Sequence, residues 1–218
     1  MPRPKPQRVI LPGGYARLEP VDDALHGDVL YAVSSVADVA ERFRWLFDEP
    51  PADRAAMRDW IERARASDDP IAFAVIDTAT GRAEGRQSLM RITPEHGVIE
   101  IGNIYWGPAI ARSRVATEAQ FLFAQYAFET LGYRRYEWKC NSLNLPSRRA
   151  AERFGFRFEG IFRQHMVVKG ESRDTAWFSM LDHEWPALKA GYLRWLAPDN
   201  FDAAGVQRRS LTDCLSAA

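Results

Sequence analysis

The first third of the chain changes between a two-residue and a helical spacing of its hydrophobic positions. Tyr15 to Glu19 has the alternation of a strand, and Asp22 or Asp23 is a suitable N-cap for a helix that follows. Asp38 to Asp48 is rich in aromatic residues and predicts no regular element. Pro51 to Ala66 begins with proline and continues with apolar residues at helical spacing, which predicts a second helix.

The middle of the chain has short apolar runs and then one long amphipathic segment. Ile71 to Ile76 is a continuous apolar run typical of a buried strand, and Gln87 to Ile92 and Val98 to Trp106 predict two further strands. From Ala116 to Leu131 apolar residues recur over a wide arc, which predicts a helix between a sheet and another layer. Gly132 follows, at the position where helices often end in a left-handed residue.

The last third again changes between strand and helix. Tyr133 to Cys140 predicts a strand, and Asn144 is a suitable cap for a short helix that ends at Gly155. The remaining elements are predicted to be the two strands of a long hairpin and a last helix: Phe156 to Val168, Asp174 to Leu181 and Glu184 to Leu196.

This order of elements defines the fold class. A helix between two strands requires a crossover and a parallel pairing, whereas three consecutive strands fit an antiparallel meander. We therefore expect an α+β protein whose central sheet is mixed, mostly antiparallel, with helices on both faces. We also expect a flexible lead-in over residues 1–14, one domain over residues 15–197 and a polar C-terminal extension over residues 198–218.

Composition narrows the range of partners and compartments. The chain has 218 residues, with 29 basic and 29 acidic side chains, so its net charge gives no general attraction to nucleic acid or to an anionic membrane. No apolar run approaches the roughly 20 residues of a membrane span, and Met1 to Arg8 lacks the apolar stretch of a signal peptide. Cys140 and Cys214 form neither a metal-binding spacing nor a disulfide framework, so we expect a cytoplasmic protein without a metal.

Candidate chemistry is first found between Glu100 and Glu118. A strand ends at Gly107-Pro108, and a short basic loop leads into the long helix. A helix N-terminus presents unpaired amides that favour a phosphate or pyrophosphate, and Arg112 and Arg114 add guanidinium donors. The same pattern also fits an ordinary connection between a strand and a helix with solvated arginines, and these residues alone leave both interpretations open.

Two segments of the chain contain short motifs that favour one interpretation of this loop. Residues 111–116 read ARSRVA and are followed by TEA, while residues 144–147 read NLPS and residues 152–156 read ERFGF. In these motifs and in the order of its elements from Tyr15 to Trp185, the chain resembles the GNAT superfamily of acyl-CoA N-acyltransferases, most closely the RimJ/RimL-type branch. The superfamily carries Q/R-x-x-G-x-G/A at its pyrophosphate loop, then N-x-x-S/A and E-K/R-x-G-F downstream.

The resemblance implies acetyl-CoA as the acyl donor. It implies that Asn144 contacts the pantetheine arm or caps the helix. Arg149 is a candidate for contact with an adenosine phosphate, although an exposed arginine on a helix usually meets only water. The resemblance places the pyrophosphate at the loop and the first helical turn, which consist of Ala111, Arg112, Ser113, Arg114, Val115, Ala116 and Thr117. The chain departs from the family at Arg114, where glycine is usual, at Ala111, where Gln or Arg is usual, and at Ala151, where many members have a tyrosine acid.

By the same resemblance, an amine attacks the thioester carbonyl directly while both substrates are bound. Glu100 is the candidate general base, and Ser147 is the candidate acid or thiol-orienting group. Glu100 could equally be a solvent-facing strand carboxylate, and Ser147 a helix-capping residue. The acceptor groove is expected along aromatic residues that could also belong to the core: Phe43, Trp45, Phe47, Tyr105 and Trp106.

These features predict an N-acetyltransferase that acts on a protein N-terminus or on a small amine. The alternative is a coenzyme A-binding or protein-binding module without turnover, because Arg114 replaces glycine and the tyrosine acid is missing. A protein that binds a nucleotide at the same helix N-terminus is a third, weaker hypothesis. Members of the branch often dimerise, so a homodimer is expected by analogy.

Overall fold

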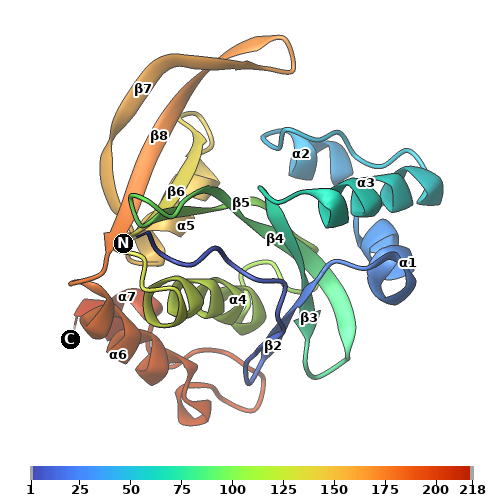
Figure 1. The fold of residues 1–218 in the computed structure, drawn as a ribbon. Coiled ribbons are helices and arrows are strands. Elements are labelled where there is room, and N and C mark those ends of the chain that lie inside the picture. The colour runs from blue at the N-terminus through green and yellow to red at the C-terminus, as the bar shows by residue number, and fades with distance from the viewer. Residues whose placement is uncertain (1, 217–218) are drawn as a thin grey trace.

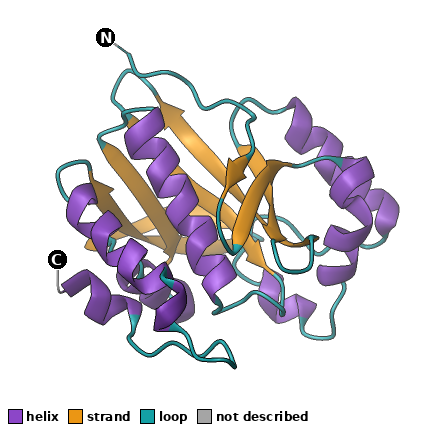
Figure 2. Ribbon diagram, turned by 90° about the horizontal axis from the view of Figure 1, so that it is seen from below, coloured by secondary structure: helices purple, strands orange, loops and turns teal. Residues whose placement is uncertain are grey.

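The computed structural model describes residues 2–216, and in it the chain forms one eight-stranded sheet with helices packed on both faces (Figures 1 and 2). The strand order is β1-β2-β3-β4-β5-β6-β8-β7, and every neighbouring pair is antiparallel except β5 and β6. The strands are β1 (Leu11–Pro12), β2 (Ala16–Pro20), β3 (Ile71–Asp77), β4 (Arg82–Thr93), β5 (Val98–Trp106), β6 (Arg135–Asn141), β7 (Arg157–Val168) and β8 (Glu171–Leu181). The mixed, mostly antiparallel sheet expected from the sequence is confirmed.

The helices divide into two groups, one for each face of the sheet. They are α1 (Asp23–Val33), α2 (Val39–Phe43), α3 (Arg54–Ala66), α4 (Arg114–Gln125), α5 (Leu145–Arg153), α6 (Trp185–Leu196) and α7 (Leu211–Ser216). A π-helical turn (Tyr126–Thr130) extends α4, and a 3-10 turn (Pro198–Asn200) follows α6. None of these helices combines the length and the apolar character needed to cross a membrane, as far as residues 2–216 are concerned.

The two faces of the sheet belong to two hydrophobic clusters, and β3 contributes to both. Phe73 and Val75 lie in the cluster of α4 and α6, where the Phe73 ring meets Phe123 edge-on with 5.2 Å between centroids. Ala72 and Ala74, on the opposite face, lie in the cluster of α1 and α3. This explains the unbroken apolar run, because a strand covered on both faces has no polar alternation.

The N-terminus of α4 differs slightly from its predicted position. The helix begins at Arg114, two residues before the expected start, because the Ser113 hydroxyl accepts hydrogen bonds from the amides of Val115 and Ala116 and so serves as the N-cap. Gly132 has a positive φ of 66°, as expected for a residue that ends a helix.

The lead-in over residues 1–14 lies against the domain in its described part. The amide of Gln7 donates to the Tyr126 hydroxyl at 2.9 Å, and β1 pairs with β2. The amide of Arg3 donates to the carbonyl of Pro94 at 2.9 Å, and the amide of Gly14 donates to the buried Glu118 carboxylate of α4 at 3.0 Å. The sequence suggested a frayed segment because it contains few apolar residues, but backbone hydrogen bonds hold it in place.

The extension after residue 197 also differs from the polar tail that its composition suggested. Its buried residues Phe201, Leu211 and Cys214 join the main hydrophobic cluster, and α7 packs on α6. The Phe201 ring meets Trp195 of α6 edge-on, with 5.1 Å between centroids. Hydrogen bonds add to this packing, since the Asn200 side chain donates to the carbonyl of Trp195 at 2.9 Å and Arg194 donates to that of Cys214 at 2.6 Å.

The β7–β8 hairpin extends beyond the rest of the sheet, and its tip bends toward α2 (Figure 1). It turns at Lys169 and Gly170, as expected, and both residues have positive φ angles. The Lys169 Nζ donates to the carbonyl of Phe43 at 3.0 Å and pairs with Glu49 at 3.2 Å. The segment predicted to be irregular, residues 38–48, contains α2, and the hairpin tip packs against its C-terminal end.

Candidate functional site

The sheet opens between its two parallel strands. The pairing of β5 and β6 runs from Val98 opposite Arg135 to Ile101 opposite Trp138, and it goes no further along the described strands. An irregularity in the β4–β5 register coincides with Asn103, which has a positive φ of 50°. A bulge of this kind bends a strand, so β5 turns away from β6 and leaves a wedge between them.

A cleft of ≈ 640 Å³ fills this wedge and continues to the α2 region. This volume lies within the range of sites that hold small molecules, about 300–1,000 Å³. Its walls include the diverging strand ends, the start of α5 and the loop before α4. Five of the site residues expected from the sequence line it: Glu100, Ala111, Arg112, Asn144 and Ser147.

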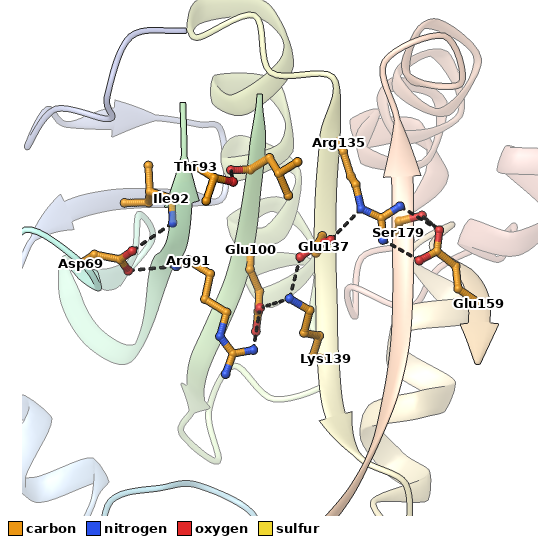
Figure 3. Close-up of polar contacts among 11 residues, drawn as sticks. Asp69, Arg91, Ile92, Thr93, Glu100, Arg135, Glu137, Lys139, Glu159 and Ser179 are labelled. Atoms are coloured by element: carbon orange, nitrogen blue, oxygen red, sulfur yellow. Dashed lines mark hydrogen bonds and ion pairs between the residues drawn. The ribbon is translucent and has the colours of Figure 1, made fainter. Parts of the chain in front are cut away.

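Glu100, which lines this cleft, lies between the two cations Arg91 and Lys139 (Figure 3). Its Oε2 is 2.8 Å from Lys139 Nζ and 3.2 Å from a guanidinium nitrogen of Arg91. Lys139 also contacts Glu137 at 2.6 Å, and Glu137 accepts from Arg135 at 2.6 Å. The side chain of Glu100 is 5 % exposed, so it is not the solvent-facing carboxylate that the sequence allowed as an alternative.

Burial and charge act in opposite directions on Glu100. Desolvation raises the pKa of its carboxyl above the ordinary value of 4.5, while Lys139 and then Arg91 oppose this by favouring the carboxylate. The net shift is upward. A carboxylate with a raised pKa is a better proton acceptor than an ordinary one, which suits a general base.

Ser147 lies at the start of α5, where its hydroxyl oxygen accepts a hydrogen bond from the Trp138 indole at 3.0 Å. Its amide is capped by the Asn144 side chain, so the capping residue of this helix is Asn144 and not Ser147. Because Trp138 occupies a lone pair, the Ser147 proton remains available for donation. The buried thiol of Cys140 lies beside it, and burial raises the pKa of that thiol.

The loop before α4 lies where the cleft meets a second cavity of ≈ 540 Å³. Arg112 lines both cavities and has a positive φ of 62°, whereas Ser113 and Val115 line only the second one. The amides of Arg112 and Arg114 donate no hydrogen bond to any described residue. These amides and the dipole of α4 favour an anion at this point.

Arg114, at the position where glycine was expected, turns its side chain toward the C-terminal extension. Its guanidinium carbon lies 4.4 Å from the ring centroid of Tyr15 and 5.4 Å from that of Phe201. These contacts place the side chain in the wall of the second cavity. Arg114 therefore stays out of the cleft between β5 and β6.

Three of the expected coenzyme-binding residues lie outside both cavity walls. Ala116 and Thr117 are buried, and Arg149 is exposed on α5. Arg153, which the sequence analysis did not select, lines the second cavity and donates to the Thr117 hydroxyl at 3.1 Å. Within residues 2–216, neither Arg112 nor Arg153 forms an ion pair. In the sequence, only its position in the ERFGF motif could have indicated Arg153 as a site residue.

The aromatic residues of the expected acceptor groove separate into two groups. Trp45, Phe47 and Trp106 line the cleft as expected. The expectation was wrong for Phe43 and Tyr105, whose rings pack with 4.9 Å between centroids in the α1–α3 cluster. The Tyr105 hydroxyl donates to the buried carbonyl of Val33, which satisfies it within the core.

A sheet that divides between two parallel strands, with a helix N-terminus and unpaired arginines at the open end, is the arrangement expected of an acyl-CoA N-acyltransferase. Residues 16–157 match the family model described as "Acetyltransferase (GNAT) domain". The match covers more than half of the chain, and the chain belongs to this family.

Two curated relatives are named as N-acetyltransferases. The chain is 30% identical over 117 residues to "Uncharacterized N-acetyltransferase p20" of Bacillus licheniformis, which covers 52% of this chain and 63% of the relative. It is 29% identical over 86 residues to "Uncharacterized N-acetyltransferase YnaD" of Bacillus subtilis, covering 39% and 50%. The matched regions thus span between half and two thirds of these relatives.

Solved structures match over more of their length. A GCN5-related N-acetyltransferase from Brucella melitensis is 65% identical with a TM-score of 0.97, over 99% of this chain and 97% of that one. A probable GNAT-family acetyltransferase from Chromobacterium violaceum is 40% identical with a TM-score of 0.79, over 85% and 92%. A putative ribosomal-protein-serine acetyltransferase from Vibrio cholerae shares the fold, at 18% identity and a TM-score of 0.67 over 79% and 97%.

Proposed function

We propose that this protein transfers an acetyl group from acetyl-CoA to a primary amine, of a protein N-terminus or of a small molecule. The observation that carries the proposal is the cleft between β5 and β6, which reaches the loop before α4 and shares Arg112 with the cavity at the N-terminus of that helix. A long ligand with a phosphorylated end and an uncharged arm fits this shape. Membership of the GNAT family supports the same donor.

The chain offers separate groups for the parts of acetyl-CoA. The amides of Arg112 and Arg114 and the guanidinium groups of Arg112 and Arg153 would hold the phosphates. The strand ends beyond Ile101 and Trp138 have backbone groups without a strand partner on the sides that face each other, and these would pair with the pantetheine amides. The thioester would then lie near Ser147, between the coenzyme and acceptor ends of the cleft.

The reaction requires two proton movements. The amine nitrogen forms a bond to the thioester carbonyl carbon, the carbon–sulfur bond breaks, and the sulfur leaves with the bonding electron pair. Glu100 would accept the proton that the amine loses, directly or through water, and Ser147 would donate a hydrogen bond to the departing thiolate. A thiol with a pKa near 8.5 leaves readily as the thiolate, so a hydrogen bond from Ser147 suffices where a tyrosine acid is missing, and water can later protonate the thiolate.

The test is acetyl transfer to a panel of peptides and small amines, followed as release of free coenzyme A and by mass spectrometry of the acceptor. We expect turnover with at least one amine and a roughly 100-fold lower kcat in Ser147→Ala. Binding of acetyl-CoA without transfer to any amine would contradict the proposal. It would favour the alternative of a coenzyme A-binding module.

A further inference from the structure

Arg173 of β8 is a buried arginine without a counterion. It is 6 % exposed, it lines the cleft, and no described carboxylate forms an ion pair with it. Its guanidinium makes no hydrogen bond to any described residue. Its Nε is buried without a partner, as is the Nε of Arg86, so the missing carboxylate is what distinguishes Arg173. An uncompensated buried charge is costly, so its presence in a cavity wall calls for a ligand that supplies the missing anion.

Another buried arginine of the same chain, Arg86, has its charge neutralised by a carboxylate. Arg86 is 3 % exposed, lies 3.2 Å from a carboxylate oxygen of Asp48, and stacks over the Trp60 ring at 4.0 Å. Arg173 has only the aromatic part of this arrangement, because its guanidinium carbon lies 5.2 Å from the centroid of Phe47. No described carboxylate occupies the place beside Arg173 that Asp48 occupies beside Arg86, and Arg173 lines the cleft.

The charges around Arg173 leave an excess of positive charge. Arg91 and Lys139 both line the cleft and both contact the Glu100 carboxylate. Lys139 also contacts Glu137, which is outside the cleft wall and is itself paired with Arg135. At the rim, Asp38 is paired with Arg42 and Glu41 with Arg44. The pKa of His165 is lowered by burial and by the same three cations, Arg91, Arg173 and Lys139, which is consistent with an electropositive region.

We propose that Arg173 binds a carboxylate of the substrate and so selects an anionic one. This inference rests on the proposed acetyl transfer. Phe47 beneath the guanidinium belongs to the acceptor end of the cleft, which favours an acceptor amine that carries a carboxylate, such as an amino acid or a peptide with an acidic first residue. The other source of the same chemistry is an acyl chain that ends in a carboxylate.

The test compares matched ligands by calorimetry. N-acetylglycine and N-acetylglycinamide are titrated into protein saturated with coenzyme A, and succinyl-CoA and butyryl-CoA are titrated into free protein. We expect at least tenfold tighter binding of the charged member in one pair, and the pair identifies whether acceptor or acyl chain carries the carboxylate. The preference disappears in Arg173→Gln and persists in part in Arg173→Lys.

The matched control is Arg163→Gln, which removes a charge from an exposed position on the same hairpin. It leaves the preference for the charged ligand unchanged.

Arg173→Gln has a melting temperature equal to or above that of the native protein, because it removes an unpaired buried charge. Equal binding within both pairs, or a preference that survives Arg173→Gln, overturns the inference. Failure of the proposed transfer would instead appear as absent turnover with neutral and acidic amines alike, while the binding pairs still decide the role of Arg173.

Discussion

Glu100 and Glu137 offer a matched pair of carboxylates for testing the base at the residue scale. Both contact Lys139, but only Glu100 lines the cleft. We expect Glu100→Gln to lower kcat about 100-fold, which is typical for loss of a general base, and Glu137→Gln to lower it much less. Equal losses in the two variants would show that Glu100 only supports Lys139.

The pH dependence of kcat provides a second readout of the same carboxylate. Burial raises the pKa of Glu100 above 4.5, and a base works only when it is deprotonated. Activity should therefore fall as the pH is lowered through this raised pKa, at a higher pH than for an ordinary glutamate. This acid limb should be absent from the residual activity of Glu100→Gln.

Cys140 lines the cleft, but its thiol should be unreactive. Burial raises its pKa, which lowers the thiolate fraction at neutral pH, and the second cysteine, Cys214, is buried as well. Ellman's reagent should therefore label neither cysteine rapidly in the folded protein and both after denaturation. Rapid labelling of folded protein, assigned by peptide mapping to Cys140, would contradict the burial described here.

Single residues also show where sequence reasoning reaches its limit. Phe43 and Phe47 are both aromatic and four positions apart, yet one is core and the other lines the cleft. Glu100 and Ser147 could be selected because each stands in or beside a recognisable motif. Arg173 could not, because its lack of a counterion depends on residues far apart in the chain that no local pattern connects.

At the element scale, Arg114 connects the first turn of α4 to the C-terminal extension. A cation–π contact at a partly exposed site contributes about 0.5–1 kcal/mol, and the Arg114 guanidinium meets the rings of Tyr15 and Phe201. We expect Arg114→Ala to increase amide hydrogen exchange across residues 201–207, with a smaller effect on acetyl-CoA affinity than Arg153→Ala. Arg112→Ala, which removes an arginine from the same loop, should leave this exchange unchanged. Unaltered amide exchange in Arg114→Ala would show that Arg114 does not hold the C-terminal extension against α4.

Elements with strong local signals were predicted, and those held by distant contacts were not. Apolar spacing predicted the long helix α4, Gly107-Pro108 marked the end of β5, and Lys169-Gly170 marked the hairpin turn. Helix α7 was missed because it has only six residues, of which Leu211 and Cys214 are buried and Leu215 is partly buried against the core. Its place is determined by packing on α6, which local sequence does not reveal.

At the scale of the whole molecule, the site arises from how the sheet is divided. The resemblance to the GNAT family predicted the sheet and the pyrophosphate loop, and the family match confirms that fold. The exact lining of the cleft was not predictable, because β5 and β6 separate after four paired positions and α2 and the hairpin tip meet beside it. The hydrogen bond between Lys169 and Phe43 at the hairpin tip joins residues 126 positions apart.

The central claim is that the cleft and the N-terminus of α4 bind acetyl-CoA, and calorimetric titration of the purified protein with acetyl-CoA tests it most directly. We expect micromolar binding that weakens about tenfold or more in Arg112→Ala and Arg153→Ala, since a charge-assisted hydrogen bond contributes about 1.5–3 kcal/mol. The matched control, Arg58→Ala on the exposed face of α3, should bind like the native protein. No heat of binding at millimolar acetyl-CoA, in protein that is folded by circular dichroism, would contradict the account.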